Sequence, residues 1–219
     1  MGTTMSFYLI ENRGFTIGSL TKKVVAVEKK TSMKEKAQAD ILHKMIQSSL
    51  SEEQKKAWGA FLQEIEQGKI AQAKERRKVG LAYRPDARWL PLFEENLCEG
   101  YNASSRDAGK LAKTFGAPVL AFSIFDSDIL FVSYADPEKG ISEDYAKPNF
   151  EGFEEYDMDQ YQEAFPQFLC AYGDEAALRE AWEGEEVFAD DRMAKLCELI
   201  GAQVLYDGSK LPQGFQWIE

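Results

Sequence analysis

The sequence predicts an α+β fold in which a small, mostly antiparallel sheet packs against helices. Two apolar runs, Val119 to Phe125 and Ile129 to Tyr134, are separated by only three polar residues. This joint predicts a central antiparallel hairpin over 119–134, because a parallel crossover needs about a dozen residues or more. Apolar residues at helical spacing predominate elsewhere. The length of 219 residues suits one compact domain, which can be bilobed.

The N-terminal part of the chain is expected to begin with strands and to continue with helices. Ser6 to Ile10 and Lys23 to Val27 are short runs rich in β-branched or aromatic residues, which predicts two strands. The apolar residues then follow a helical period, and Ser51 with Gln54 forms a capping-box pattern. An antiparallel helical hairpin is therefore expected over 31–65.

The middle of the chain carries a basic cluster and two further predicted helices. The cluster at 74–78 has three interpretations: a solvated face, a surface that docks on the chain's own acidic half, or a site for an external anion. Trp89 to Leu97 has one apolar side and predicts a short helix. Another helix is expected to begin at Ser104 and to end at Gly116, where glycine supplies a left-handed residue.

After Tyr134 the pattern is irregular at first and helical afterwards. Prolines and glycines interrupt the stretch from Asp136 to Gly152, which predicts a long loop. The remaining elements expected from periodicity are helices at Met158 to Tyr172 with a bend at Pro166, at Glu175 to Trp182 and at Asp190 to Ile200, and a last strand at Phe215 to Ile218.

The charge is distributed unevenly along the chain. Residues 136–191 hold 18 Asp and Glu against three Lys and Arg, whereas residues 1–135 hold 16 acidic and 20 basic side chains. We therefore divide the chain into an α+β core region at 1–135 and an acidic, mainly helical lobe at 136–219.

Aromatic residues lie among the carboxylates of the acidic half. Exposed carboxylates speed the capture of a basic partner, and aromatic side chains supply anchors that become buried in an interface. An alternative stays open, in which the aromatic residues form the core of a helical lobe and the acidic residues form its solvent-exposed surface. The candidate partner-binding residues are Glu143, Asp144, Tyr145, Phe150, Phe153, Glu154, Glu155, Tyr156, Asp157 and Asp159.

In this charge pattern the chain resembles bacterial immunity and antitoxin-type proteins. The resemblance implies a non-enzymatic interaction or inhibitor protein whose acidic face covers the lysines and arginines of a basic partner protein. The formal net charge of −11 disfavours nucleic acid and anionic membranes as partners. A homo-oligomer is compatible with the sequence, and no cofactor is expected.

The alternative is a divalent-metal enzyme built on Asp126 and Asp128. Two carboxylates at a strand end can hold Mg²⁺ or Mn²⁺ together with a phosphate oxygen. The stretch Phe122 to Leu130 resembles the DxD element of nucleotide-sugar glycosyltransferases and the first motif of haloacid-dehalogenase-like phosphatases. The resemblance implies a phosphorylated or nucleotide-linked substrate. The competing interpretation is that both aspartates form the hairpin turn.

Other motifs in the sequence are few. His43 is the single histidine, which excludes zinc sites made of several histidines. The three cysteines Cys98, Cys170 and Cys197 follow apolar neighbours, so we expect core thiols and a reducing compartment. No apolar run approaches the ~20 residues of a membrane helix, and a cytoplasmic protein is expected.

Overall fold

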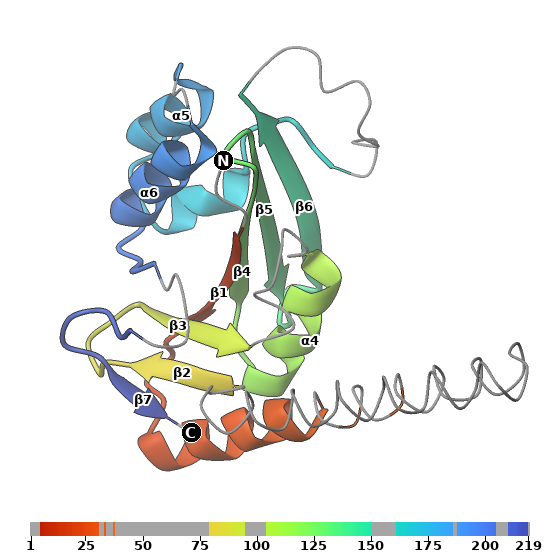
Figure 1. Ribbon diagram of the computed structural model, residues 1–219, viewed down its shortest axis with the longest axis vertical. Coiled ribbons are helices and arrows are strands. Elements are labelled where there is room, and N and C mark those ends of the chain that lie inside the picture. Colours follow the sequence, from red (N-terminus) through yellow and green to blue (C-terminus); the bar gives the residue numbers. More distant parts are fainter. Residues whose placement is uncertain are drawn as a thin grey trace, which may run out of the picture.

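The computed structural model describes residues 5–30, 33, 37, 79–94, 104–149, 161–185, 188–204 and 210–218. These described residues form one seven-stranded antiparallel sheet with helices on both faces, so the predicted α+β class is confirmed (Figure 1). The strand order is β6-β5-β4-β1-β3-β2-β7. The strands are β1 Met5–Glu11, β2 Val79–Tyr83, β3 Trp89–Glu94, β4 Val119–Phe125, β5 Ile129–Asp136, β6 Ile141–Pro148 and β7 Gln216–Ile218.

The predicted central hairpin is formed by β4 and β5. Their register runs from Val119 opposite Ala135 to Phe125 opposite Ile129. Asp126 and Ser127 adopt left-handed conformations with φ of 49° and 62°. Short polar residues tolerate this conformation better than bulky ones, which explains why the turn falls at these positions.

The stretch from Asp136 to Gly152 was expected to be a loop, and this prediction is wrong for most of it. It contains β6, which pairs with β5 from Ile129 opposite Pro148 to Asp136 opposite Ile141. A strand at the edge of a sheet can carry charged residues and proline, because one side of its backbone has no neighbouring strand. For this reason the sequence of β6 lacks the continuous apolar run of a central strand, and this is why the strand was not predicted.

Two further predictions of local structure are wrong. Lys23 to Val27 lies in a helix at residues 17–30, where Leu20, Val24 and Val27 are buried on one side. Tertiary packing outweighs the β preference of its valines. Trp89 to Leu97 begins with β3 instead of a helix, since its apolar residues contact alternate faces of the sheet.

Part of the prediction falls outside the described residues. This holds for the helical hairpin at 31–65, except that Met33 and Ala37 are helical, and for the basic cluster at 74–78. It also holds for Cys98 and for residues 150–160.

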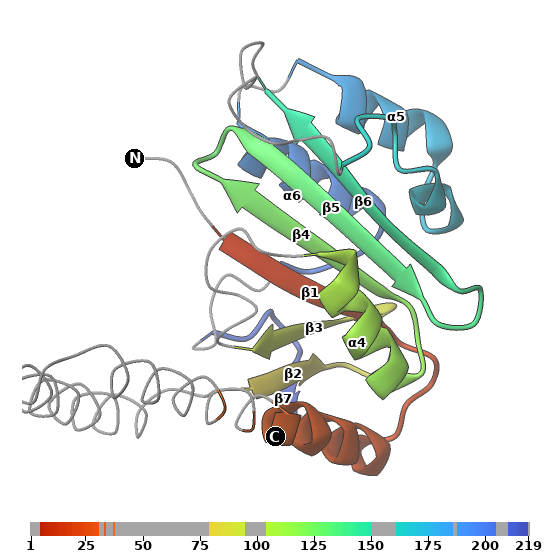
Figure 2. The same cartoon turned by 90° about the vertical axis from the view of Figure 1, so that its right-hand side faces the viewer.

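Two helical layers cover the two faces of the sheet. Helix 17–30 and α4 (Ser105–Phe115) share one core with Tyr8 and Ile10 of β1. The 3-10 helix η1 (Gln167–Ala171), α5 (Glu175–Glu183) and α6 (Ala189–Leu199) share the other core with Phe7 and Leu9. Successive residues of β1 thus point to opposite layers, as the pleat of a strand requires. Figure 2 shows α4 in front of the sheet and α6 behind it.

The ends of the helices follow the sequence signals closely. The Ser104 hydroxyl accepts a hydrogen bond from the Asp107 N–H at 3.3 Å, and Gly116 ends α4 with φ 63°. Of the helix predicted from Met158 to Tyr172, the described part forms only η1. Pro166 lies directly before η1 and cannot donate a backbone hydrogen bond, which prevents a longer helix there.

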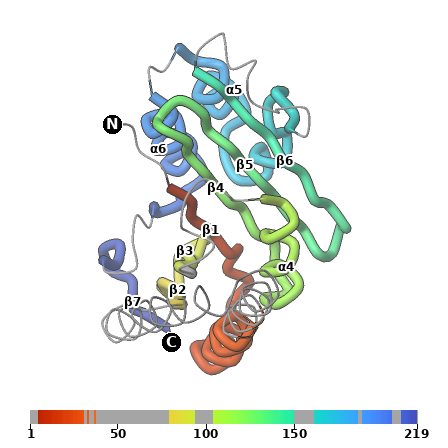
Figure 3. Tube along the Cα trace, turned by 45° about the vertical axis from the view of Figure 1, so that its right-hand side comes forward, coloured from red at the N-terminus to blue at the C-terminus, as the bar shows by residue number. Residues whose placement is uncertain are grey.

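The region expected to form the acidic lobe, 136–219, contributes both edges of the sheet. β6 flanks β5 on one side, and β7 pairs with β2 on the other, with Leu81 opposite Ile218 (Figure 3). The sheet is accordingly larger than expected, and β6 and β7 belong to the same sheet as the N-terminal strands.

Candidate functional site: two oppositely charged helical layers

The helical layers on the two faces of the sheet carry opposite charge. We define the acidic layer as residues 161–185 and 188–204, which hold nine Asp and Glu against three Lys and Arg, a net charge of −6. We define the basic layer as helix 17–30 and residues 104–116, which hold seven Lys and Arg against two Asp and Glu, a net charge of +5. The buried sheet separates them, so each layer presents its own sign of charge to solvent.

Most carboxylates of the acidic layer face solvent. Arg179 donates a hydrogen bond to Glu175 at 2.9 Å and another to Gln167 at 2.8 Å. The hydrogen bonds of Arg179 and Gln167 hold the pKa of the Glu175 carboxyl below its ordinary value. Arg192 is buried and donates to the Trp182 carbonyl, so it adds little positive charge to the surface. The exposed carboxylates are Glu163, Asp174, Glu175, Glu180, Glu183, Glu185, Asp191 and Glu198.

An exposed aromatic ring lies at the start of α6. Phe188 is 51% exposed and directly precedes the helix, whose first turn contains Asp190 and Asp191. The Ala189 N–H donates to the Ser127 carbonyl at 2.8 Å. This bond places the turn of the central hairpin beside the N-terminus of α6, so Asp126 and Asp128 join the acidic side of the molecule.

The two predicted metal ligands lie in this turn. Asp126 is exposed and Asp128 is half-buried. The Asp128 N–H donates to the Phe125 carbonyl at 2.9 Å, and the Asp128 carbonyl accepts from the Asn149 N–H at the same distance. Within the described ranges, no three His, Cys, Asp or Glu side chains gather in a way that could hold a metal ion.

Three of the predicted partner-binding residues are described, namely Glu143, Asp144 and Tyr145, and all three form hydrogen bonds within the fold. The Asp144 carboxylate accepts hydrogen bonds from the Ser105 N–H at 2.7 Å, the Ser105 hydroxyl at 2.5 Å and the Ser133 hydroxyl at 2.6 Å. Tyr145 is buried, and its hydroxyl donates to Glu143 at 2.7 Å. Burial, together with the Glu143 carboxylate, raises the pKa of Tyr145.

The other predicted partner-binding residues lie outside the described residues, but both ends of their segment are fixed. Asn149 is held by Asp128 on one side and accepts a hydrogen bond from Arg192 at 3.2 Å on the other. Gln162 donates to the Asp144 carbonyl at 2.9 Å, and its own carbonyl accepts from the Ala146 N–H at 3.0 Å. The described residues on either side of 150–160 therefore lie at β6. The predicted partner-binding residues outside the described residues are Phe150, Phe153, Glu154, Glu155, Tyr156, Asp157 and Asp159.

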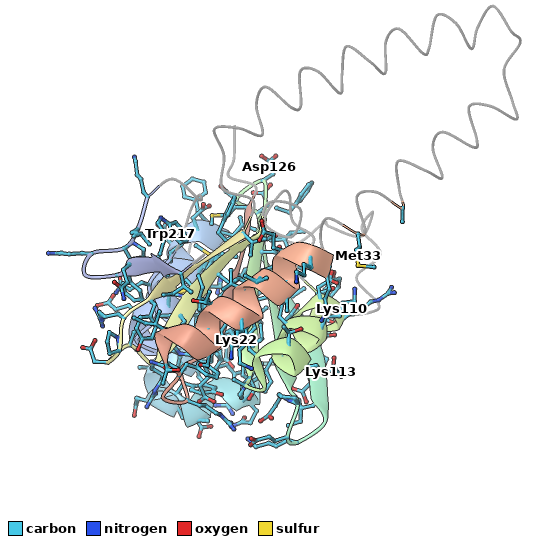
Figure 4. The ribbon with its side chains drawn as sticks, turned by 90° about the horizontal axis from the view of Figure 1, so that it is seen from below. Lys22, Met33, Lys110, Lys113, Asp126 and Trp217 are labelled. Carbon is cyan, nitrogen blue, oxygen red and sulfur yellow. The ribbon has the colours of Figure 1, made fainter. Side chains whose placement is uncertain are left out.

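Sequence reasoning missed the basic layer. Its two helices are joined by the Lys23 ammonium, which donates to the Thr114 carbonyl at 3.1 Å, and by Lys30, which donates to the Thr114 hydroxyl at 2.9 Å. Figure 4 shows Lys22 on helix 17–30 and Lys110 and Lys113 on the neighbouring α4. The available signal was the seven-residue spacing of Lys22 to Lys29 and of Lys23 to Lys30, which places each pair on one helix face.

A cavity of about 330 Å³ lies at the C-terminal end of α6. Its lining includes Cys197 and Glu198. Burial raises the pKa of the Cys197 thiol, so this sulfur stays protonated and packs as a core side chain, as predicted. Cys170 is half-buried, and burial raises its pKa as well.

Comparison with known proteins finds no relative of this chain. No protein-family model matches the chain, and neither a curated protein nor a solved structure is significantly similar to it. In the part of the chain that the structure describes, no helix is both long enough and apolar enough to cross a membrane.

Proposed function

We propose that this protein is a non-enzymatic interaction or inhibitor protein that binds a basic partner through its acidic layer. The observation that supports the proposal best is the segregation of charge across the sheet. Carboxylates gathered on one face, with the cations on the opposite face, produce a one-sided field that attracts and orients a positively charged protein.

The layer also has the rigidity that an interface needs. Leu178, Trp182, Met193 and Leu196 are buried beneath α5 and α6 and fix both helices against the sheet. The backbone that carries the carboxylates is already ordered before binding, which reduces the entropic cost of association. Phe188 supplies an exposed aromatic anchor beside them.

The segment 150–160 is part of the proposal, together with Glu143. The described residues that flank it are Asn149, which bonds to the hairpin turn at Asp128, and Gln162, which bonds to β6. We assign the carboxylates and aromatic residues of the segment to binding of the same basic partner. The mechanism is occlusion: the acidic face covers lysines and arginines that the partner needs for its own activity.

The test is capture of a partner from native extract with the whole protein immobilised. The triple variant Glu180→Lys, Glu183→Lys and Glu198→Lys reverses three exposed carboxylates of the acidic layer. The matched control Glu28→Lys, Asp86→Lys and Glu138→Lys makes the same change in net charge elsewhere on the surface. We expect a basic protein to be retained by the wild type and the control, to elute with salt, and to be lost by the first variant. Equal loss with both variants would refute a role for the acidic layer.

The metal-enzyme alternative is tested separately. If Asp126 and Asp128 hold Mg²⁺ or Mn²⁺, the melting temperature rises with metal concentration, and Asp126→Asn with Asp128→Asn abolishes the rise. A melting temperature independent of both ions removes this alternative.

A further inference from the structure

We infer that the basic layer of one molecule docks on the acidic layer of a second copy of the same chain, so that copies associate head to tail. The inference uses the acidic layer of the proposed function, but it requires no other protein. It begins from a feature that the proposed function leaves unused, namely a positively charged face on a chain of net charge −11.

Both layers keep most of their charge available for a partner. Among the described residues, Lys110 pairs with Asp107 at 2.5 Å, whereas Lys22, Lys29 and Lys113 are exposed and form no ion pair. In the acidic layer, Arg179 pairs with Glu175 at 2.9 Å. The net charges of +5 and −6 are therefore of similar size and opposite sign.

One helix of each layer has the same length. α4 and α6 are both 11 residues long, which corresponds to about 16 Å of helix. A second copy can therefore cover the basic layer with its own acidic layer. A nucleic acid would continue past the two helices and meet the negatively charged remainder of the chain, which opposes its binding.

The overall negative charge does not prevent this contact under physiological conditions. The Debye length is about 8 Å at physiological ionic strength, so charges far from the interface are screened. The free energy of association therefore depends mainly on the attraction between the two layers that face each other. Salt well above physiological ionic strength also screens the attraction between the facing layers, and the association then weakens.

The position of the layers determines the form of the assembly. They lie on opposite faces of the sheet, so one copy cannot use both of them against the same neighbour. The contact is heterologous, and copies add one after another instead of closing into a two-fold dimer. Inside such a chain the acidic layer is covered, which makes self-association a competitor of the basic partner.

Sedimentation velocity of the full-length protein tests the inference. The first variant carries Lys22→Glu, Lys110→Glu and Lys113→Glu, which remove the net positive charge of the basic layer and leave the acidic layer unchanged. The second carries Glu180→Lys, Glu183→Lys and Glu198→Lys, which neutralise the acidic layer only. All six side chains are exposed, and unchanged circular dichroism and melting temperature will show that both variants fold.

At about 50 mM NaCl the wild type is expected to give a sedimentation coefficient that rises continuously with concentration, and at about 500 mM NaCl that of a monomer. Each variant alone is expected to associate at least about tenfold more weakly. An equimolar mixture retains one intact pair of layers, so it is expected to form a heterodimer that does not grow further.

A wild type that stays monomeric at low salt overturns the inference, and so does a mixture that fails to associate. Tight binding of a labelled uridine homopolymer that is lost in the first variant would assign the basic layer to nucleic acid instead. If the protein does not self-associate but capture of a basic partner still depends on Glu180, Glu183 and Glu198, the self-association is refuted. The proposed function is then unaffected.

Discussion

The carboxylate of Asp144 on β6 accepts a hydrogen bond from the backbone N–H of Ser105, the first residue of α4, at 2.7 Å. A negative charge at this end of a helix is stabilised by the helix dipole and by the free N–H groups. Asp144 therefore fastens the basic layer to the edge strand of the sheet. Asp144, one of the predicted partner-binding residues, thus supports the position of the lysines on α4.

Replacing Asp144 with alanine is expected to lower the free energy of unfolding by about 2–3 kcal/mol, because the Ser105 N–H and the Ser133 hydroxyl lose their acceptor. Asp144→Asn keeps one acceptor oxygen and is expected to cost less. Urea unfolding measures both changes. Ser142→Ala at an exposed position of the same strand is the control, and a loss of equal size there would contradict the role of Asp144.

Asp136 is expected to make stability depend on pH. Burial opposes its ionisation, but hydrogen bonds from the N–H groups of Lys139 and Glu138 and the charge of Lys139 outweigh burial and lower its pKa. A lowered pKa adds stability that is present above the unfolded value of about 3.9 and is lost as pH falls through the folded value. Urea unfolding from about pH 6 to pH 2.5 should show a smaller loss for Asp136→Asn than for the wild type. Parallel losses would contradict this prediction.

The two glycines of α4 and its cap are expected to respond to alanine in opposite directions. Gly116 has φ 63°, so Gly116→Ala should destabilise the protein by about 1 kcal/mol. Gly109 lies within the helix with open space around its Cα, so Gly109→Ala should stabilise by about 0.5–1 kcal/mol. Thermal unfolding of the two variants measures both effects. Changes of the same sign would contradict the role of Gly116 as the C-cap.

Arg192 is expected to be the most sensitive charged residue of the acidic layer. Its buried guanidinium donates to the Trp182 carbonyl and to Asn149, which joins α5 and α6 to the end of β6. Arg192→Ala should cost about 3 kcal/mol, since it removes a buried guanidinium whose hydrogen bonds hold the Trp182 carbonyl and Asn149. The exposed Lys195→Ala on the same helix should change stability by about 0.5 kcal/mol or less, as chemical denaturation can measure. Equal costs would refute the structural role of Arg192.

The elements that could be predicted are those with strong local signals. The β4–β5 hairpin has long apolar runs and a polar turn, and α4 has Ser104 and Gly116 at its ends. α5 and α6 were also placed almost correctly. In each case local preference and tertiary packing favour the same structure.

The elements that were missed depend on contacts distant in sequence. β6 is a strand because β5 lies beside it, and β3 is a strand because it pairs with β1 and β2. The valines of helix 17–30 favour a strand locally, yet they become helical by packing on the sheet. The acidic side of the molecule was visible in the sequence, but the basic layer required the three-dimensional arrangement of two distant helices.

The most direct test of charge segregation is the site at which a decalysine peptide binds the isotope-labelled protein, mapped from amide chemical shifts at low ionic strength. Shifts are expected in α5, α6 and the turn at Asp126 to Asp128, they should reverse with salt, and the amides of helix 17–30 and α4 should not change. Shifts spread evenly over both faces of the sheet, or concentrated on helix 17–30 and α4, would contradict the account.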